Sequence, residues 1–244
     1  MTTPLRKWSH FTKRLLPRYI AKYRSRGHWN NFDYIFIIAY GRSGSTLLQL
    51  VLNSIDGVLI RGENQNFFEK LYRADKALRV AMSHRGSQPQ HPWYGAECIE
   101  LNAFRAELKR SVVDYVLRPQ PGDVVVGFKE IRYTVDLLND EDFEEYLDFL
   151  RETFSRAAFI FNTRDLIDVN KSGWWADRPD SMKILSATEK RFQKYLQRQL
   201  PDCIHIHYNN YFEDAAALMP LFDFLGARFD RASVERLLST RLSH

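Results

Sequence analysis

A continuous run of seven apolar residues, from Tyr34 to Tyr40, constrains this chain more than any other feature of its sequence. A strand with one face in water alternates apolar and polar residues, whereas this run is apolar throughout, so both of its faces must be covered. A glycine-rich turn at positions 41–46 follows, and a helical pattern begins at Ser45 and continues to Ile55. The run therefore predicts a buried strand that leads through a tight turn into a helix.

Short β-rich runs alternate with segments of helical period along the rest of the chain. The expected strands cover residues 58–60, 124–128, 157–162 and 203–208. The expected helices cover residues 67–82, 96–117, 141–154, 186–200 and 214–225, and Gly226 ends the last of them. Strands separated by helices require crossover connections, which favour a parallel sheet. The 244 residues, 45% apolar, are therefore predicted to form a single α/β domain with a P-loop-like, doubly wound parallel sheet flanked by helices.

The positive charge is concentrated at the N-terminus. Residues 1–33 hold eight Lys and Arg and one acid, Asp33, so this stretch carries +7 and the other 211 residues sum to −2. Apolar residues recur there at helical spacing: Trp8, Phe11, Leu15, Tyr19 and Tyr23. We expect a basic amphipathic arm at residues 1–32 and a folded domain at 33–244. Two interpretations of the arm stay open: a helix packed on the domain and broken near Pro17, or peripheral contact of residues 1–26 with an anionic membrane surface.

Composition excludes several classes of protein. The arm lacks the continuous apolar run of a signal-peptide core or a membrane anchor, and no later stretch reaches 18 apolar residues, so a cytoplasmic protein is the default expectation. Because the body outside the arm carries net negative charge, nucleic acid is not an expected partner. Two cysteines, Cys98 and Cys203, are too few for a disulfide scaffold or a cysteine-based metal cluster, and we expect both to be buried thiols.

The turn after the first strand contains the residue types that bind phosphate. It reads Gly41, Arg42, Ser43, Gly44, Ser45, Thr46. Its glycines permit close backbone approach, its hydroxyls can donate hydrogen bonds, and the helix that follows presents free N–H groups. It is not a Walker A loop, because no Lys stands between Gly44 and Ser45. The positively charged residue of this turn is Arg42, which comes before Gly44 rather than after it.

The sequence YGRSGSTLL resembles the 5′-phosphosulfate loop of the sulfotransferases that use 3′-phosphoadenosine 5′-phosphosulfate (PAPS) and release adenosine 3′,5′-bisphosphate (PAP). A second family signature, an Arg after a later strand with a Ser eight residues on, has a counterpart in Arg164 and Ser172. The resemblance implies that both grip the 3′-phosphate, the Arg as a planar fork of donors. A third likeness, from Cys203 to Gly226, implies a donor-binding role for Tyr208, although Asn209 and Asn210 replace the family's acidic turn.

The base that activates the acceptor is argued from the same resemblance. Small-molecule cytosolic sulfotransferases use a His two residues beyond a strand-end Lys, but here Ile131 follows Lys129 at that distance. The carbohydrate and protein-tyrosine branches, like bacterial glycolipid enzymes, place a Glu shortly after the second strand. Glu63, twenty-one positions after Arg42, matches it and is the candidate base. Lys129 and Arg42 are then expected to stabilise the departing phosphate without a metal ion. His84 and His91 are alternative bases.

The sequence thus predicts a PAPS-dependent sulfotransferase acting on a hydroxyl, of a carbohydrate or glycolipid rather than of a phenol, with the hydroxyl of tyrosine left open. Two alternatives remain at this point. A P-loop nucleotide kinase would need magnesium and ATP, and it lacks the Walker Lys. A non-catalytic nucleotide-binding module would make Glu63 dispensable.

Overall fold

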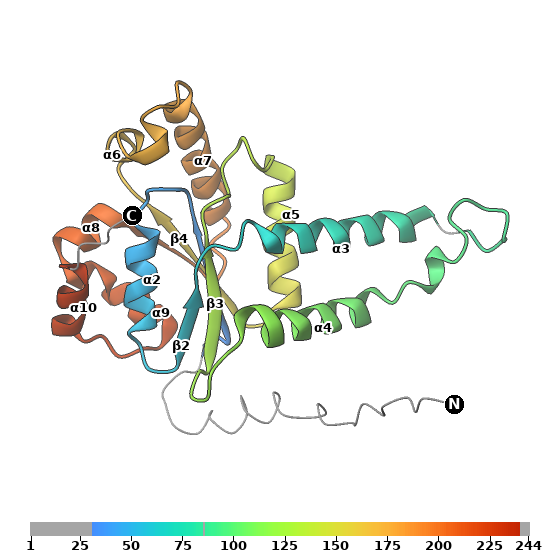
Figure 1. Cartoon of the computed structure of the whole chain (residues 1–244), viewed down its shortest axis with the longest axis horizontal. Helices are drawn as coiled ribbons and strands as arrows, with labels where there is room; N and C mark the ends of the chain where they lie inside the picture. The colour runs from blue at the N-terminus through green and yellow to red at the C-terminus, as the bar shows by residue number, and fades with distance from the viewer. Residues whose placement is uncertain (1–30, 85, 240–244) are drawn as a thin grey trace, which may run out of the picture.

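The computed structural model describes residues 31–84 and 86–239, so nearly all of the arm predicted at residues 1–32 lies outside the described residues. Within this part of the chain, one sheet contains β1 (Tyr34–Ala39), β2 (Val58–Arg61), β3 (Val125–Glu130), β4 (Ala157–Thr163) and β5 (Cys203–His207). Neighbouring strands are all parallel and lie in the order β2-β3-β1-β4-β5. Helices cover both faces of the sheet (Figure 1). The predicted α/β fold with a parallel sheet is confirmed.

The central strand β1 is buried on both faces, as its apolar run predicts. Its residues are at most 6% exposed. Tyr34, Phe36 and Ile38 point into one hydrophobic cluster, and Ile35 and Ile37 point into the other. Because side chains of a strand alternate between faces, a run that is apolar at every position supplies both cores at once.

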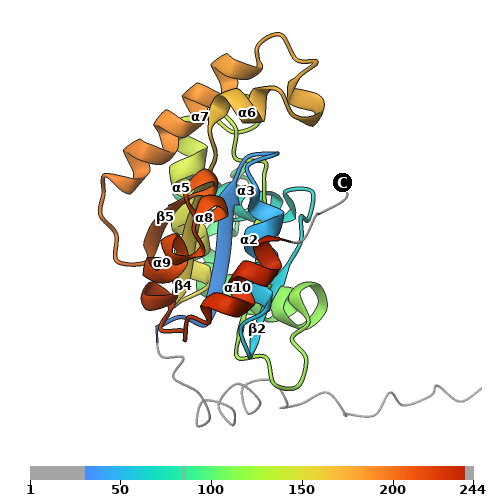
Figure 2. The ribbon, with the colours of Figure 1, turned by 90° about the vertical axis from the view of Figure 1, so that its left-hand side faces the viewer.

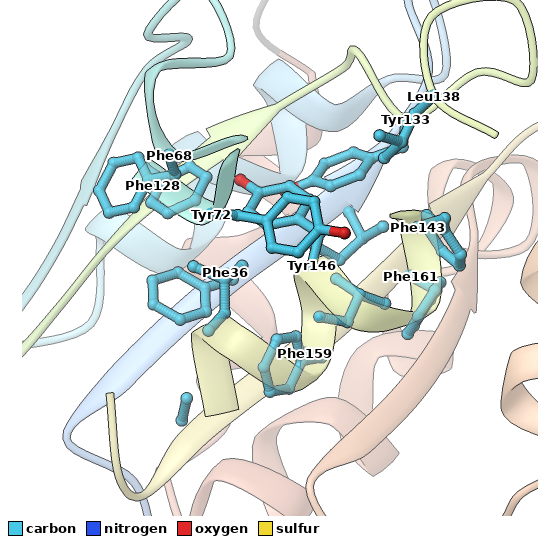
Figure 3. Close-up of a cluster of buried hydrophobic side chains, with 14 of the residues drawn as sticks. Phe36, Phe68, Tyr72, Phe128, Tyr133, Leu138, Phe143, Tyr146, Phe159 and Phe161 are labelled. Atoms are coloured by element: carbon cyan, nitrogen blue, oxygen red, sulfur yellow. The ribbon is translucent and has the colours of Figure 1, made fainter. Parts of the chain in front are cut away.

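Aromatic side chains fill the core on the face covered by α3 (Phe67–His84), α5 (Asp140–Thr153) and α7 (Ser181–Leu196). The ring of Phe68 stacks on that of Phe128 with centroids 3.9 Å apart, and Phe36 lies 4.8 Å from Phe128 (Figure 3). The helix α4 (Leu101–Ser111) runs beside α3, and both extend away from the sheet (Figure 1).

The opposite face of the sheet is covered by α2 (Ser45–Asn53), α8 (Tyr208–Glu213), α9 (Met219–Leu225) and α10 (Arg231–Leu238). The last of these helices packs against α2, as the turned view shows (Figure 2). Gly226 ends α9 with a φ of 70°, in the left-handed region, which confirms the predicted helix stop. No helix among residues 31–84 and 86–239 is both long and apolar enough to cross a bilayer.

Two predicted helices are interrupted. The segment predicted as one helix over 96–117 consists of a 3-10 turn (Ala96–Cys98), α4 and a π-helical turn (Val112–Leu117), because Ile99 leaves the helical conformation. The segment 214–225 begins as a 3-10 turn (Ala215–Leu218) capped by the Asp214 side chain. Pro220, which cannot donate a backbone hydrogen bond, then stands in the first turn of α9.

Other boundaries also differ from the sequence prediction. The helix expected at 186–200 is α7, which starts earlier, at Ser181, and ends at Leu196. The strand expected to reach Tyr208 ends at His207, because α8 begins at Tyr208. Besides α8, the short α6 (Leu166–Asn170), the 3-10 turn at Gly173–Trp175 and α10 were not predicted. The prediction of two buried thiols is wrong for Cys98, which is exposed, and Cys203 is half-buried.

Candidate active site

The carboxyl ends of the parallel strands meet at one edge of the sheet, and a cleft of about 870 Å³ lies there. This is the edge at which doubly wound sheets bind ligands. Eight of the residues singled out from the sequence line the cleft: Arg42, Gly44, Ser45, Thr46, Glu63, Lys129, Arg164 and Tyr208. They follow or end β1, β2, β3, β4 and β5, so the fold brings together side chains that are far apart in the sequence.

The loop between β1 and α2 has a backbone that suits an anion. Arg42 and Gly44 adopt the left-handed region with φ of 67° and 81°, and α2 begins directly at Ser45. The first N–H groups of α2 have no partner within the helix and carry its positive dipole end. A Cβ placed on Gly44 would lie 2.0 Å from Cδ2 of Tyr208, so only glycine fits there.

Three buried groups hold this loop in place, and sequence reasoning missed all of them. The Asn162 side chain on β4 donates to the carbonyl of Ser43 at 2.8 Å. The indole Nε1 of Trp175 donates to the carbonyl of Gly41 at 3.0 Å, and the hydroxyl of Tyr211 donates to Oδ1 of Asn162 at 3.2 Å and lies 3.4 Å from the carbonyl oxygen of Gly44. Ser43 is fully buried, and its side chain faces Asn162 rather than the cleft.

Glu63 and Lys129 form an ion pair at the floor of the cleft. Nζ of Lys129 lies 2.6 Å from Oε1 of Glu63 and 3.4 Å from Oγ1 of Thr46. The Lys129 side chain is 5% exposed and that of Glu63 is 41% exposed, so a fixed cation holds a carboxylate that solutes can reach. The neighbouring Glu130 does not pair with Lys129, because consecutive strand residues point to opposite faces. Its carboxylate turns toward the start of α3 instead.

Arg164 lies at the other side of the loop, at the end of β4. Its guanidinium donates to the carbonyl of Arg42 at 3.3 Å and lies over the ring of Tyr208, 4.7 Å from the centroid. The Tyr40 hydroxyl accepts from the backbone N–H of Arg164 at 2.9 Å. Burial, together with Glu189, raises the pKa of Tyr40, which therefore stays a neutral phenol. Ser172 is not among the lining residues of the cleft, and its Oγ accepts from Nε of Arg42 at 2.9 Å.

Of the aromatic and histidine residues near the predicted site, some line the cleft and others do not. Trp174 is half-exposed and lines the cleft, whereas Trp175 is buried and cannot present its ring to a ligand. His84, the last residue of α3, stacks on Trp93 with ring centroids 4.5 Å apart, and neither His84 nor His91 lines the cleft. Ile131 and Leu47 line the cleft as well, and sequence reasoning did not single out five further lining residues: Gln49, Gly62, Phe212, Leu238 and Ser239.

The described residues fit a nucleotide that carries phosphate groups at two positions. Cationic side chains stand at two places in the cleft: Lys129 lies beside Thr46 at the start of α2, and Arg164 lies beside the aromatic ring of Tyr208. Arginine and lysine at such points bind phosphate oxygens through charge-assisted hydrogen bonds. The cleft therefore has cations on both sides of the loop and a reachable carboxylate at one end.

Comparisons with known proteins identify the family of the chain. The model of the sulfotransferase family matches residues 33–231, so the chain belongs to that family. The sulfotransferase domain of the olefin synthase from Synechococcus PCC 7002 is 21% identical with a TM-score of 0.54, over 87% of this chain and 79% of that chain. Retinol dehydratase in complex with androsterone and PAP is 16% identical with a TM-score of 0.38, over 91% and 68% of the two chains. Among curated sequences, none matches significantly.

The chain is accordingly a PAPS-dependent sulfotransferase, and PAPS is its co-substrate. This assignment decides against the nucleotide kinase and the non-catalytic module that the sequence had left open.

Proposed function

We propose that this enzyme transfers the sulfonyl group of PAPS to a hydroxyl of a carbohydrate or glycolipid, with Glu63 as the general base. The observation that carries the proposal is the meeting of Glu63 and Lys129 at 2.6 Å beside Thr46 of the phosphate loop. A proton acceptor and the cation that would neutralise the leaving phosphate thus lie at the same point of the cleft. Sulfonyl transfer to a hydroxyl needs both.

The order of the strands supports a division of the cleft into donor and acceptor parts. The phosphate loop follows the central β1, with Arg164 and Tyr208 on the β4 and β5 side and Glu63 and Lys129 on the β2 and β3 side. In this proposal Gly41 to Thr46 hold the 5′-phosphosulfate, and Arg164, Ser172 and Tyr208 hold the 3′-phosphate end. The acceptor then enters over β2 and β3, next to Glu63.

The side chains divide the chemistry among them. PAPS supplies the sulfonyl group, and its phosphate gains negative charge as the bond to sulfur breaks. Arg42 and Lys129 bind that charge, and since the charge grows toward the transition state, they stabilise it more than the ground state. Glu63 takes the proton of the attacking hydroxyl. Its 41% exposure allows an acceptor to reach it, and Lys129 keeps the carboxylate beside the loop.

The acceptor class is inferred from the position of the base and from the lining of the cleft. Ile131 occupies the position at which the cytosolic sulfotransferases for small phenols have a His. It lines the cleft, but its side chain has no acid–base group. Gln49 and Gly62 line the cleft together with Glu63, and the half-exposed Trp174 offers an indole face of the kind on which sugar rings pack.

The test compares Glu63→Gln with wild type in PAP binding and in transfer from ³⁵S-labelled PAPS to octyl β-glucoside, trehalose, a tyrosine peptide and p-nitrophenol. We expect PAP affinity within about twofold of wild type and transfer lower by roughly 10²–10⁴, because the variant keeps the shape but cannot accept the proton. His84→Ala is the control and should retain activity. Wild-type preference for p-nitrophenol over both sugars would contradict the acceptor class, and a Glu63→Gln rate within threefold of wild type would contradict the base.

The role of Arg164 is tested by comparing two donor nucleotides. Arg164→Ala should weaken PAP binding at least tenfold but affect adenosine 5′-phosphosulfate, which lacks the 3′-phosphate, by less than threefold. Isothermal titration with both compounds measures the difference. Equal losses would mean that Arg164 does not read the 3′-phosphate.

A further inference from the structure

A fully buried carboxylate, that of Glu130, remains outside the chemistry described so far. It lies at the end of β3 and is 0% exposed. Its Oε2 accepts from the backbone N–H of Asn66 at 2.8 Å and of Asn64 at 3.3 Å, and its Oε1 accepts from the N–H of Ile131 at 2.9 Å. Burying a carboxylate is costly unless such hydrogen bonds satisfy it. The bonds of Glu130 thus join β3 to the segment between β2 and α3.

That segment is a strained turn, and it carries Glu63. It runs from the end of β2 at Arg61 to the start of α3 at Phe67. Within it, Gln65 and Asn66 both have a φ of 58°, in the left-handed region, which residues with a side chain disfavour. Two successive residues of this kind keep their conformation only where surrounding contacts impose it. Glu130 binds the N–H of Asn66, one of these two residues, and the N–H of Asn64, which directly follows Glu63.

The strand β3 therefore holds the turn from both of its faces. Lys129 points into the cleft and binds the side chain of Glu63, whereas Glu130 points the other way and binds the backbone that follows it. Neither contact alone fixes the carboxylate, because Lys129 leaves the backbone free and Glu130 leaves the side chain free. Together they determine where the Glu63 carboxylate lies relative to the phosphate loop.

We propose that Glu130 is a positioning residue for the general base, acting through the Asn64 and Asn66 backbone to set the place of Glu63. The proposal rests on the proposed function of Glu63. Glu130 itself touches neither the cleft nor the reacting atoms. A displacement of a catalytic group by about 1 Å can cost on the order of 10²-fold in rate, so loosening this turn is expected to slow transfer while donor binding persists.

The test is a double-mutant cycle built from Glu63→Gln and Glu130→Gln. A carboxylate accepts hydrogen bonds on both oxygens, but an amide accepts on only one. In Glu130→Gln the amide NH₂ group therefore faces a backbone N–H, either that of Ile131 or one of those in the turn, and one hydrogen bond is lost. Activity is PAP release from PAPS, with octyl β-glucoside as the acceptor and, separately, with water alone. We expect Glu130→Gln to lower kcat about 10–100-fold with the KM for PAPS and PAP affinity within twofold. In the Glu63→Gln background it should cost less than threefold more.

Asp75→Asn is the matched control, because Asp75 is also a fully buried carboxylate but binds Arg105 and Arg79 between α3 and α4. It should lower stability without lowering kcat more than threefold. If Glu130→Gln does not fold, as judged by loss of PAP binding, Glu130→Asp replaces it, since it keeps both acceptor oxygens at a shorter reach.

Results that contradict the positioning role of Glu130 differ from results that contradict Glu63 as the general base. A Glu130 variant with kcat within threefold of wild type, or losses that multiply fully in the double variant, would overturn the positioning role while leaving Glu63 as the base. An inactive Glu130 variant accompanied by an equally inactive Asp75→Asn would mean that stability alone is responsible. A fully active Glu63→Gln would instead remove the proposed function, and the role of Glu130 with it.

Discussion

Replacing Gly44 by Ala perturbs the phosphate loop at the point where its backbone and its packing are both most restricted. Gly44 has a φ of 81° and directly precedes α2. A Cβ added there would lie 2.0 Å from Cδ2 and 2.5 Å from Cε2 of the Tyr208 ring. That ring cannot move freely, because it stacks on Phe212 at 5.1 Å and packs edge-on against Tyr211 at 5.4 Å.

The cost has two separable parts. The left-handed conformation costs a residue with a Cβ about 1–2 kcal/mol. Forcing extra volume into a packed site costs about 1–3 kcal/mol more. Gly95 isolates the first part, because its φ is 85° and a Cβ there would meet nothing within 4 Å. We therefore expect Gly95→Ala to lower the free energy of unfolding by about 1–2 kcal/mol and Gly44→Ala to lower it by about 2–5 kcal/mol.

Urea unfolding of both variants measures these losses, and PAP titration measures the effect on the site. Only Gly44→Ala should weaken PAP, by at least tenfold. In Tyr208→Ala the clash is absent, so adding Gly44→Ala to that variant should cost about as much as Gly95→Ala does. Equal destabilisation by Gly44→Ala and Gly95→Ala in the wild-type background would refute the argument that Tyr208 closes against the loop.

Two further outcomes are expected. Although burial alone would raise it, hydrogen bonds from Lys76, Tyr72 and Arg73 hold the pKa of Asp142 below its usual value, so its stabilisation is present above about pH 4 and is lost as the pH falls further. Asp142→Asn should therefore cost about 1–3 kcal/mol at pH 7 and progressively less below pH 4 in urea unfolding; a constant difference would contradict this. Deleting residues 1–26 should abolish any flotation with anionic vesicles at low salt and leave PAP affinity unchanged, whereas an intact protein that never floats would exclude the membrane interpretation.

The sequence determined the class of the fold through local patterns that the tertiary structure could not easily override. The apolar run at Tyr34 to Tyr40 needs cover on both faces, and β1 is central and buried on both. The glycine turn between strand and helix is equally local, because glycine adopts the φ of 81° found at Gly44 without steric cost. Helix ends were less determinate: the extended Ile99 breaks a segment whose apolar periodicity continues through it, and the segment 214–225 begins as a 3-10 turn before α9.

The assembly of the site was only partly readable from sequence. The resemblance to the sulfotransferases pointed to Arg42, Glu63, Lys129 and Arg164, and all four line one cleft. That Lys129 would pair with Glu63 rather than with its neighbour Glu130 follows from strand geometry and from the order β2-β3-β1, which places the end of β2 beside β3.

Only the tertiary structure decided what holds the site in shape. Asn162 and Trp175 bind loop carbonyls that precede them by more than a hundred residues, and Glu130 binds backbone N–H groups more than sixty residues before it. Such contacts leave no periodicity or spacing in the sequence, since any buried donor or acceptor could satisfy a backbone group that the fold happens to bring near. The chemistry of the site was therefore visible in local residue types, whereas its rigidity depends on long-range hydrogen bonds that exist only after the sheet has assembled.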